Sequence, residues 1–183
     1  MSIQTKSVSS NKDSRHDLTR LQVSTWTEVD EYLLRCKGII LPIGSTEQHG
    51  PTGAIGTDAL TAEAVALEVG RRTGVLVAPV QPYGMAEHHL AFPGTMSLQP
   101  QTLLNVIHDL LISLAKNGFE RIFLVNGHGG NIATTKAAFA QTYKTIANLK
   151  LAVSDSFRCK IVSWFMTPSV FREAQKLYGE SEG

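Results

Sequence analysis

The sequence has little cysteine, no long apolar run and no excess of charge of either sign. Cys36 and Cys159 stand alone rather than in a C-x-x-C pair, which argues against a thiolate metal site and fits a reducing compartment. No apolar stretch approaches the roughly 20 residues that a membrane helix needs, and the polar start does not resemble a signal peptide. The 17 Lys and Arg residues balance 16 Asp and Glu residues, so no basic surface for nucleic acid is expected. We therefore expect a cytoplasmic protein that binds neither membranes nor nucleic acid.

The length and composition indicate one domain preceded by an arm. A chain of 183 residues with 43% apolar content can bury one good core. Residues 1–19 are rich in Ser, Lys, Asp and Asn and nearly lack large apolar groups, so they cannot offset the entropy of ordering. We expect a flexible N-terminal arm at 1–19 and a folded domain at 20–183.

Short apolar segments alternate with amphipathic ones along the domain. The apolar segments predict strands at 39–43, 75–80, 121–125, 149–153 and 161–165. Helical spacing of apolar residues predicts helices at about 25–35, 58–72, 103–114, 132–148 and 168–178. Strands that alternate with helices favour an α/β fold, a sandwich around a mostly parallel sheet. In such sheets ligands bind beyond the carboxyl ends of the strands.

Four side chains that can bind a metal follow two of the predicted strands. Glu47 and His49 are two residues apart, so in an extended segment both point to the same side, and Asp58 follows in the same loop. His128 lies far downstream, after another strand. Two carboxylates and two imidazoles form a mixed N/O set that suits Zn²⁺, Mn²⁺ or Fe²⁺. The alternative is a polar loop in which Asp58 caps the helix that follows it.

Glycines surround His128 in the string N-G-H-G-G-N at 126–131. Gly129 and Gly130 let the backbone pass close to a ligand, and the helix that follows offers N–H groups and a positive dipole to an anionic intermediate. This combination predicts an oxyanion site beside the metal. The alternative is an ordinary turn with a solvated histidine.

Further candidates lie in the long segment 81–99 and at the end of the last predicted strand. A loop of that length in a small domain is usually functional, and it contains the tripeptide Glu87-His88-His89. Glu87 and His88 are candidate proton donors by position, although the local sequence by itself favours a solvent-facing polar patch. Trp164 is a candidate wall of the substrate pocket, or else a core residue.

The motifs together resemble the creatininase (creatinine amidohydrolase) family. Four strings occur in the family's order: E-Q-H-G-P at 47–51, T-D at 57–58, F-P-G-T at 92–95 and N-G-H-G-G-N at 126–131. The resemblance implies a three-layer α/β/α sandwich, a binuclear site that usually holds zinc or manganese, and assembly as a homo-oligomer, commonly a hexamer.

Carried over by motif, the resemblance gives the four candidate side chains a role as metal ligands: Glu47, His49, Asp58 as the bridge between two ions, and His128. Creatininase itself supplies a further glutamate where this chain has Gly130, so we expect a substrate other than creatinine. The family also places a His/Glu segment beyond the last helix, so we expect the domain at 20–183 to lack its C-terminal part.

The function predicted from the sequence is that of a metal-dependent amidohydrolase. It would cleave a non-peptide C–N bond in a small cyclic amide or formamide by means of a metal-activated water. The alternative is a non-catalytic ligand-binding protein, or a truncated inactive relative that retains the fold.

Overall fold

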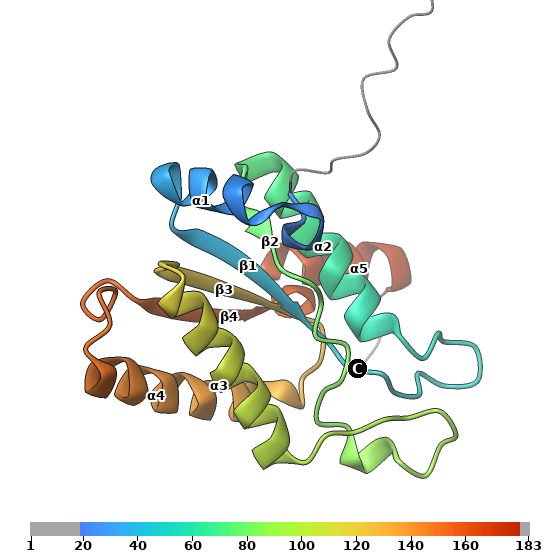
Figure 1. Ribbon diagram of the computed structural model, residues 1–183. Coiled ribbons are helices and arrows are strands. Elements are labelled where there is room, and N and C mark those ends of the chain that lie inside the picture. Colours follow the sequence, from blue (N-terminus) through green and yellow to red (C-terminus); the bar gives the residue numbers. More distant parts are fainter. Residues whose placement is uncertain (1–18, 180–183) are drawn as a thin grey trace, which may run out of the picture.

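The computed structural model describes residues 19–179 and contains a parallel sheet between two layers of helices (Figure 1). The strands follow the order β2-β1-β3-β4, and every neighbouring pair is parallel. Their bounds are Gly38–Ile43 for β1, Leu76–Val77 for β2, Arg121–Asn126 for β3 and Arg158–Ser163 for β4. The α/β class and the parallel sheet predicted from the sequence are thus confirmed.

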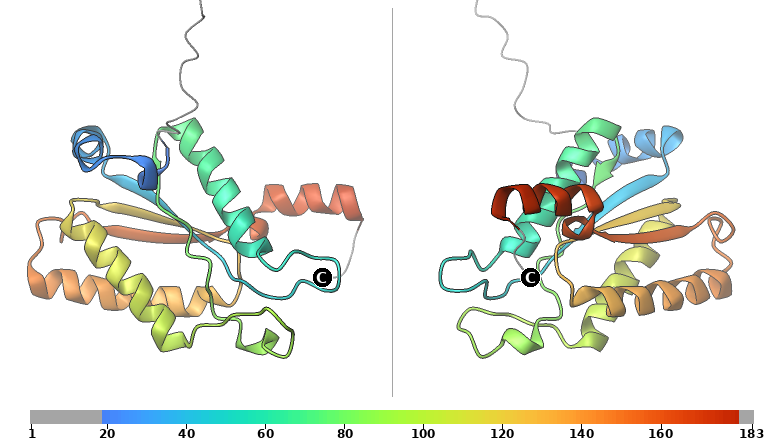
Figure 2. Two further views of the ribbon diagram at one scale, coloured as in Figure 1. Left: turned by 45° about the vertical axis from the view of Figure 1, so that its right-hand side comes forward. Right: turned by 180° about the vertical axis from the view of Figure 1, so that it is seen from behind.

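Helices cover both faces of this sheet (Figure 2). One face carries α2 (Thr57–Thr73) and α5 (Pro168–Tyr178), and the other carries α3 (Pro100–Lys116) and α4 (Asn131–Leu149). Helix α1 (Trp26–Arg35) precedes β1, and short 3₁₀ turns lie at η1 (Leu21–Val23), η2 (Glu87–His89) and η3 (Trp164–Met166). None of the helices within residues 19–179 is long and apolar enough to cross a bilayer.

Local signals in the sequence explain where the helices begin and end. Thr25 and Glu28 form a capping box at the start of α1, which satisfies two backbone N–H groups that the helix leaves unpaired. Pro100 and Pro168 open α3 and α5, where a missing N–H costs nothing. Gly74 ends α2 with a φ of 71°, a conformation that only glycine adopts without strain.

The core consists of two apolar clusters, one on each face of the sheet. The larger cluster joins β1 and β3 to α1, α3 and α4 and includes the fully buried Leu103, Ile107 and Phe157. The smaller cluster lies under α2 and includes Ala62 and Ala66, which are completely buried. Small side chains on α2 let this helix lie close to the sheet, so its first turn reaches the ends of β1 and β3.

Strand β2 is shorter than the prediction of 75–80. Only Leu76 and Val77 pair regularly with β1, and the ladder resumes as a single bridge between Ile43 and Gln81. Pro79 and Pro82 explain the interruption, because proline has no N–H to donate to a ladder.

The prediction of a strand at 149–153 is wrong, because no strand forms there. Helix α4 continues through Leu149 and ends at Lys150, which adopts a left-handed φ of 51°. A turn follows, from which Val153 enters the larger core cluster. Val153 is the buried residue of this segment, whereas Leu149 is 52% exposed and Ala152 is exposed.

The last strand, β4, spans Arg158–Ser163 instead of the predicted 161–165. It begins earlier because β4 is an edge strand, in which the exposed Arg158 and Lys160 alternate with partly buried residues. It ends earlier because η3 begins at Trp164.

The predicted N-terminal arm lies almost wholly outside the described residues. Its last residue, Thr19, accepts a hydrogen bond from the backbone N–H of Val77 at 2.7 Å. The described chain therefore begins beside β2.

Two glycines let α2 approach the strand ends. A Cβ on Gly44 would lie 2.3 Å from the backbone nitrogen of Ala59, and a Cβ on Gly127 would overlap the carbonyl oxygen of Asp58. Both contacts are with the first turn of α2. Any side chain at either position would push that turn, and Asp58 with it, away from the strand ends.

We expect Gly127→Ala to destabilise the fold by about 3 kcal/mol, because backbone atoms cannot move aside as a side chain can. Gly129→Ala is the matched control: a Cβ at Gly129 would meet no described atom within 4 Å, so its effect should stay below about 0.5 kcal/mol. Urea unfolding of both variants measures the difference. Equal stabilities would show that the close approach to Asp58 carries no packing constraint.

Candidate functional site

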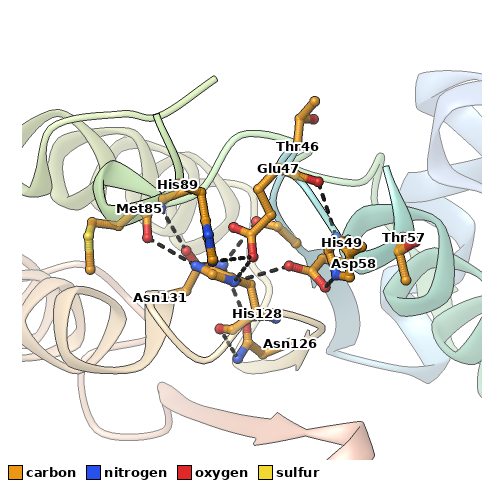
Figure 3. A network of polar contacts seen from close by, with 12 residues as sticks. Thr46, Glu47, His49, Thr57, Asp58, Met85, His89, Asn126, His128 and Asn131 are labelled. Carbon is orange, nitrogen blue, oxygen red and sulfur yellow. Dashed lines mark hydrogen bonds and ion pairs between the residues drawn. The ribbon is translucent and has the colours of Figure 1, made fainter. Parts of the chain in front are cut away.

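The four candidate ligands lie at the carboxyl ends of two neighbouring parallel strands. Ile43 at the end of β1 is in register with Asn126 at the end of β3. Glu47 and His49 follow β1, His128 follows β3, and Asp58 lies in the first turn of α2. Figure 3 shows their side chains converging on one point from these three segments. The sheet topology thus brings residues 47 and 128 together.

Glu47, Asp58 and His128 form the buried centre of the site. Their exposed fractions are 4%, 7% and 6%. Nδ1 of His128 lies 3.1 Å from Oε1 of Glu47 and 3.0 Å from Oδ2 of Asp58 (Figure 3). Buried charges are stable only when opposite charges meet them. Two carboxylates around one imidazole leave an excess of negative charge, which favours a cation.

Asp58 lies between two histidines. Its Oδ1 is 3.0 Å from Nε2 of His49, while its Oδ2 faces His128. Glu47, His49 and Asp58 each present a ligand atom within 4.8 Å of the others. The carboxylate of Asp58 therefore directs one oxygen to each side of the site.

Backbone carbonyl groups fix the orientation of both imidazoles. Nε2 of His128 is 2.9 Å from the carbonyl oxygen of Met85, and Nδ1 of His49 is 3.1 Å from the carbonyl oxygen of Glu47. In each ring one nitrogen donates to a carbonyl group and the other faces the carboxylates. Metal-binding histidines are held in this way, because the outer hydrogen bond fixes the tautomer.

The same contacts shift the protonation of the buried pair. Burial disfavours the charged imidazolium, but the contacts with Asp58 and Glu47 outweigh it and raise the pKa of His128 to about 10. Burial likewise favours the neutral acid of Glu47, but contacts with His128 and Ser45 outweigh it and hold its pKa below the ordinary value. Both shifts favour charged groups at neutral pH.

Two oxygen atoms of the site are available to a cation. Oε2 of Glu47 is buried and accepts no hydrogen bond from the residues that the structure describes, and the buried Oδ2 of Asp58 meets only Nδ1 of His128, 3.0 Å away. Buried carboxylate oxygens of this kind are normally satisfied. Together with two oriented imidazoles they make an N/O donor set that suits zinc or manganese. The residues thus fit a divalent metal site.

Two buried asparagines that the sequence interpretation missed hold the segments in place. The amide of Asn131 donates to the carbonyl oxygen of Gly44 at 2.9 Å and accepts from the N–H of Met85 at 3.1 Å. Asn126 donates to the carbonyl oxygen of His128 at 2.7 Å. They are the first and last residues of N-G-H-G-G-N, so the motif that pointed to His128 also contained both asparagines.

Gly130 protects the hydrogen bond that orients His128. A Cβ at this position would lie 2.5 Å from both Nε2 of His128 and the carbonyl oxygen of Met85. Any side chain there would displace one of the two groups. Gly129, by contrast, is exposed and has open space around it.

The long segment 81–99 contributes His89 to the site. Nε2 of His89 lies 3.5 Å from Oε1 of Glu47, and its Nδ1 accepts from the side-chain amide of Gln48 at 3.0 Å. His88 is exposed, with its ring stacked 6.1 Å from that of His128, and Glu87 is exposed and bound to Gln99. The 3₁₀ turn η2 directs adjacent side chains to different sides, and the sequence pattern did not predict this turn.

Trp164 lies apart from the polar cluster. It follows β4 in η3 and packs against the smaller core cluster beneath α2. Its indole Nε1 is buried and finds no hydrogen-bond partner within residues 19–179. Its neighbours there include Val65 and Val125, which line a small apolar cavity.

Fold and site together define an α/β protein with a candidate metal centre at the carboxyl edge of its parallel sheet. The family model described as creatinine amidohydrolase matches residues 22–183. The chain therefore belongs to the creatininase family.

Curated relatives and solved structures agree with this assignment. The chain is 32% identical over 147 residues to the 3-dehydro-scyllo-inosose hydrolase of Thermotoga maritima, covering 76% of this chain and 47% of that protein. It is 35% identical over 113 residues to the creatinine amidohydrolase of Pseudomonas putida, covering 58% and 44%. A creatininase crystal structure superimposes with a TM-score of 0.80 at 28% identity, covering 90% of this chain and 64% of that one. The chain thus spans about half the length of these curated relatives.

The pKa of His128 predicts how the stability of the metal-free protein depends on pH. A pKa raised from 6.5 to about 10 by folding contributes stability that is fully present below pH 6.5 and is lost as the pH rises through about 10. We expect the unfolding free energy, measured with urea and a chelator, to fall across this range.

His128→Gln is the control for this pH dependence, since a neutral amide cannot titrate. The variant should be less stable at pH 6.5, and the decline between pH 6.5 and 10 should be smaller than in the wild type. An identical decline in both proteins would assign the titration to other groups.

Proposed function

We propose that this protein is a metal-dependent amidohydrolase that cleaves a non-peptide C–N bond in a small cyclic amide or formamide. The observation that carries the proposal is the position of Asp58, whose two oxygens face His49 on one side and His128 on the other. Membership of the creatininase family and similarity to a creatinine amidohydrolase support the reaction class.

The proposed centre would hold two divalent ions, with Asp58 as the residue that bridges them. His49 would complete one side, and Glu47 with His128 would complete the other. Solved creatininases that superimpose on this chain include a manganese form, with a TM-score of 0.79, and a mutant of Zn-Zn type, with a TM-score of 0.76. These support zinc or manganese here, and the N/O donor set also accommodates iron.

When bound, such ions lower the pKa of water and polarise a carbonyl group. The protein's own groups would supply orientation and proton transfer. Backbone N–H groups of Gly129 and Gly130, which precede α4, would stabilise negative charge on the amide oxygen. We retain Glu87 and His88 as proposed proton donors to the leaving nitrogen, and Trp164 as a proposed wall of the substrate pocket.

The proposed substrate is not creatinine. By the family resemblance, Gly130 stands where creatininase has a further glutamate. The overlap of a Cβ with the His128–Met85 contact leaves no room for a side chain. The relatives differ in the substrates that their names give, an inosose in one and a mycofactocin precursor peptide in another. Assembly as a homo-oligomer, with a hexamer as the family's common form, and location in the cytoplasm stay predictions.

We expect His49→Ala to weaken metal binding without unfolding the protein. His49 lies in a loop outside both core clusters, so its loss removes a ligand but little packing. Loss of an outer-sphere partner alone costs 10–100-fold in metal affinity, so loss of a ligand should cost more than about 100-fold. Titration with Zn²⁺ or Mn²⁺ measures the effect.

His108→Ala serves as the matched control for that titration. His108 lies in α3, and its side chain is bound to Thr142 of α4 rather than to a candidate ligand, so its replacement should leave metal affinity unchanged. If His49→Ala and His108→Ala bind metal equally well, His49 is not a ligand.

Activity separates an amidohydrolase from a metal-binding protein without turnover. We expect the metal-loaded protein to release product from a member of a panel of cyclic amides and formamides. A chelator should abolish that release, and Zn²⁺ or Mn²⁺ should restore it. Full metal occupancy without turnover on any member would contradict the proposed reaction and favour a ligand-binding protein.

A further inference from the structure

The motif F-P-G-T at 92–95 takes no part in the proposed metal centre, yet it lies directly beside it. Figure 2 shows the loop at 48–56 and the loop at 84–98 side by side at one end of the molecule. A pocket of about 350 Å³ opens between the two loops. Its wall includes His49, so the pocket begins at a candidate ligand.

Carbon atoms form most of this pocket's surface. Pro51 and Ile55 line it from the first loop, and Phe92 and Pro93 line it from the second. Gln48 is also in the wall, but its side chain is already engaged: Nε2 donates to His89 at 3.0 Å, and Oε1 accepts from the N–H of Gly50 at 2.8 Å. The pocket therefore has few groups that could bind a polar or charged substituent.

The two walls are held at a fixed separation by contacts between the loops. The N–H of Gln48 donates to Oγ1 of Thr95 at 3.2 Å, and the N–H of Met96 donates to the carbonyl oxygen of Thr46 at 2.9 Å. Gly94 has a φ of 88°, and a Cβ there would lie 2.5 Å from Cδ1 of Ile55. Glycine at this turn thus lets the second loop pack against Ile55.

Apolar side chains in this pocket remain accessible. Phe92 is 52% exposed and Ile55 is 38% exposed, although both contribute to the same concave surface. A volume of about 350 Å³ is at the small end of the range for ligand pockets, which are mostly apolar with a few polar groups at one side. Here the polar side is His49.

We propose that this pocket binds an apolar substituent of the substrate, an aromatic or branched aliphatic group next to the amide that is hydrolysed. The inference rests on the proposed function, because it takes the reacting amide to lie at the metal centre beside His49. Phe92 and Ile55 then determine specificity, and the F-P-G-T motif and Gly94 keep the two walls together. The preferred substrate is a small amide that carries such a group.

Two hydroxamates test this inference by binding. Acetohydroxamate and phenylacetohydroxamate share a metal-binding head and differ in one phenyl ring. We expect the protein loaded with Zn²⁺ or Mn²⁺ to bind phenylacetohydroxamate at least about tenfold more tightly, because the ring becomes buried between Phe92 and Ile55. Phe92→Ala and Ile55→Ala should each reduce that ratio to about threefold or less.

Leu90→Ala is the matched control. Leu90 is an apolar side chain of the same loop, 48% exposed, and does not line the pocket. Its replacement should leave both affinities unchanged. Thermal unfolding of all three variants checks that the loops remain folded.

The outcomes separate failure of the pocket from failure of the metal centre. If acetohydroxamate binds but the phenyl ring adds no affinity, or if the ratio survives both Phe92→Ala and Ile55→Ala, the pocket inference is overturned while the metal centre stands. If neither hydroxamate binds the metal-loaded protein, the proposed centre fails and the pocket inference fails with it.

Discussion

The structure depends on the meeting of two buried carboxylates, Glu47 and Asp58, with the imidazole of His128. All three groups are at most 7% exposed, and Nδ1 of His128 lies 3.1 Å from Glu47 and 3.0 Å from Asp58, on three segments of the chain. Such a cluster is stable only if its charges are balanced. The protonated imidazole balances one carboxylate, and a divalent cation would balance both. The site is therefore electrostatically suited to a metal before any analogy with other proteins is considered.

The surrounding fold keeps these groups together. Parallel pairing of β1 with β3 places the two loops side by side, and Gly44 and Gly127 admit the first turn of α2 with Asp58. Asn131 then joins the end of β1 to the loop at Met85, whose carbonyl group orients His128. Small residues and amides thus position the carboxylates and imidazoles of the candidate site.

Much of this architecture could be predicted from the sequence, because continuous apolar strands and helix caps are local signals. The convergence of residues 47–58 with 128 followed from the rule that parallel strands present their carboxyl ends together. The errors came from tertiary effects. The apolar segment at 149–153 ends α4 and forms a turn instead of a strand, and within it only Val153 is buried. His89, and not only its neighbour His88, approaches the site because a 3₁₀ turn sets the direction of each side chain. The roles of Asn131 and Gly130 depend on Gly44 and Met85, which are distant in sequence.

The most direct test of the central claim is a crystal structure with anomalous scattering measured at the zinc and manganese edges. The account predicts two anomalous peaks on either side of the Asp58 carboxylate, at coordination distances of about 2.0–2.2 Å from its oxygens. His49 should bind one ion, and Glu47 with His128 should bind the other. Metal peaks that do not touch Asp58, or a metal-soaked crystal with the His128 imidazole still between both carboxylates, would contradict it.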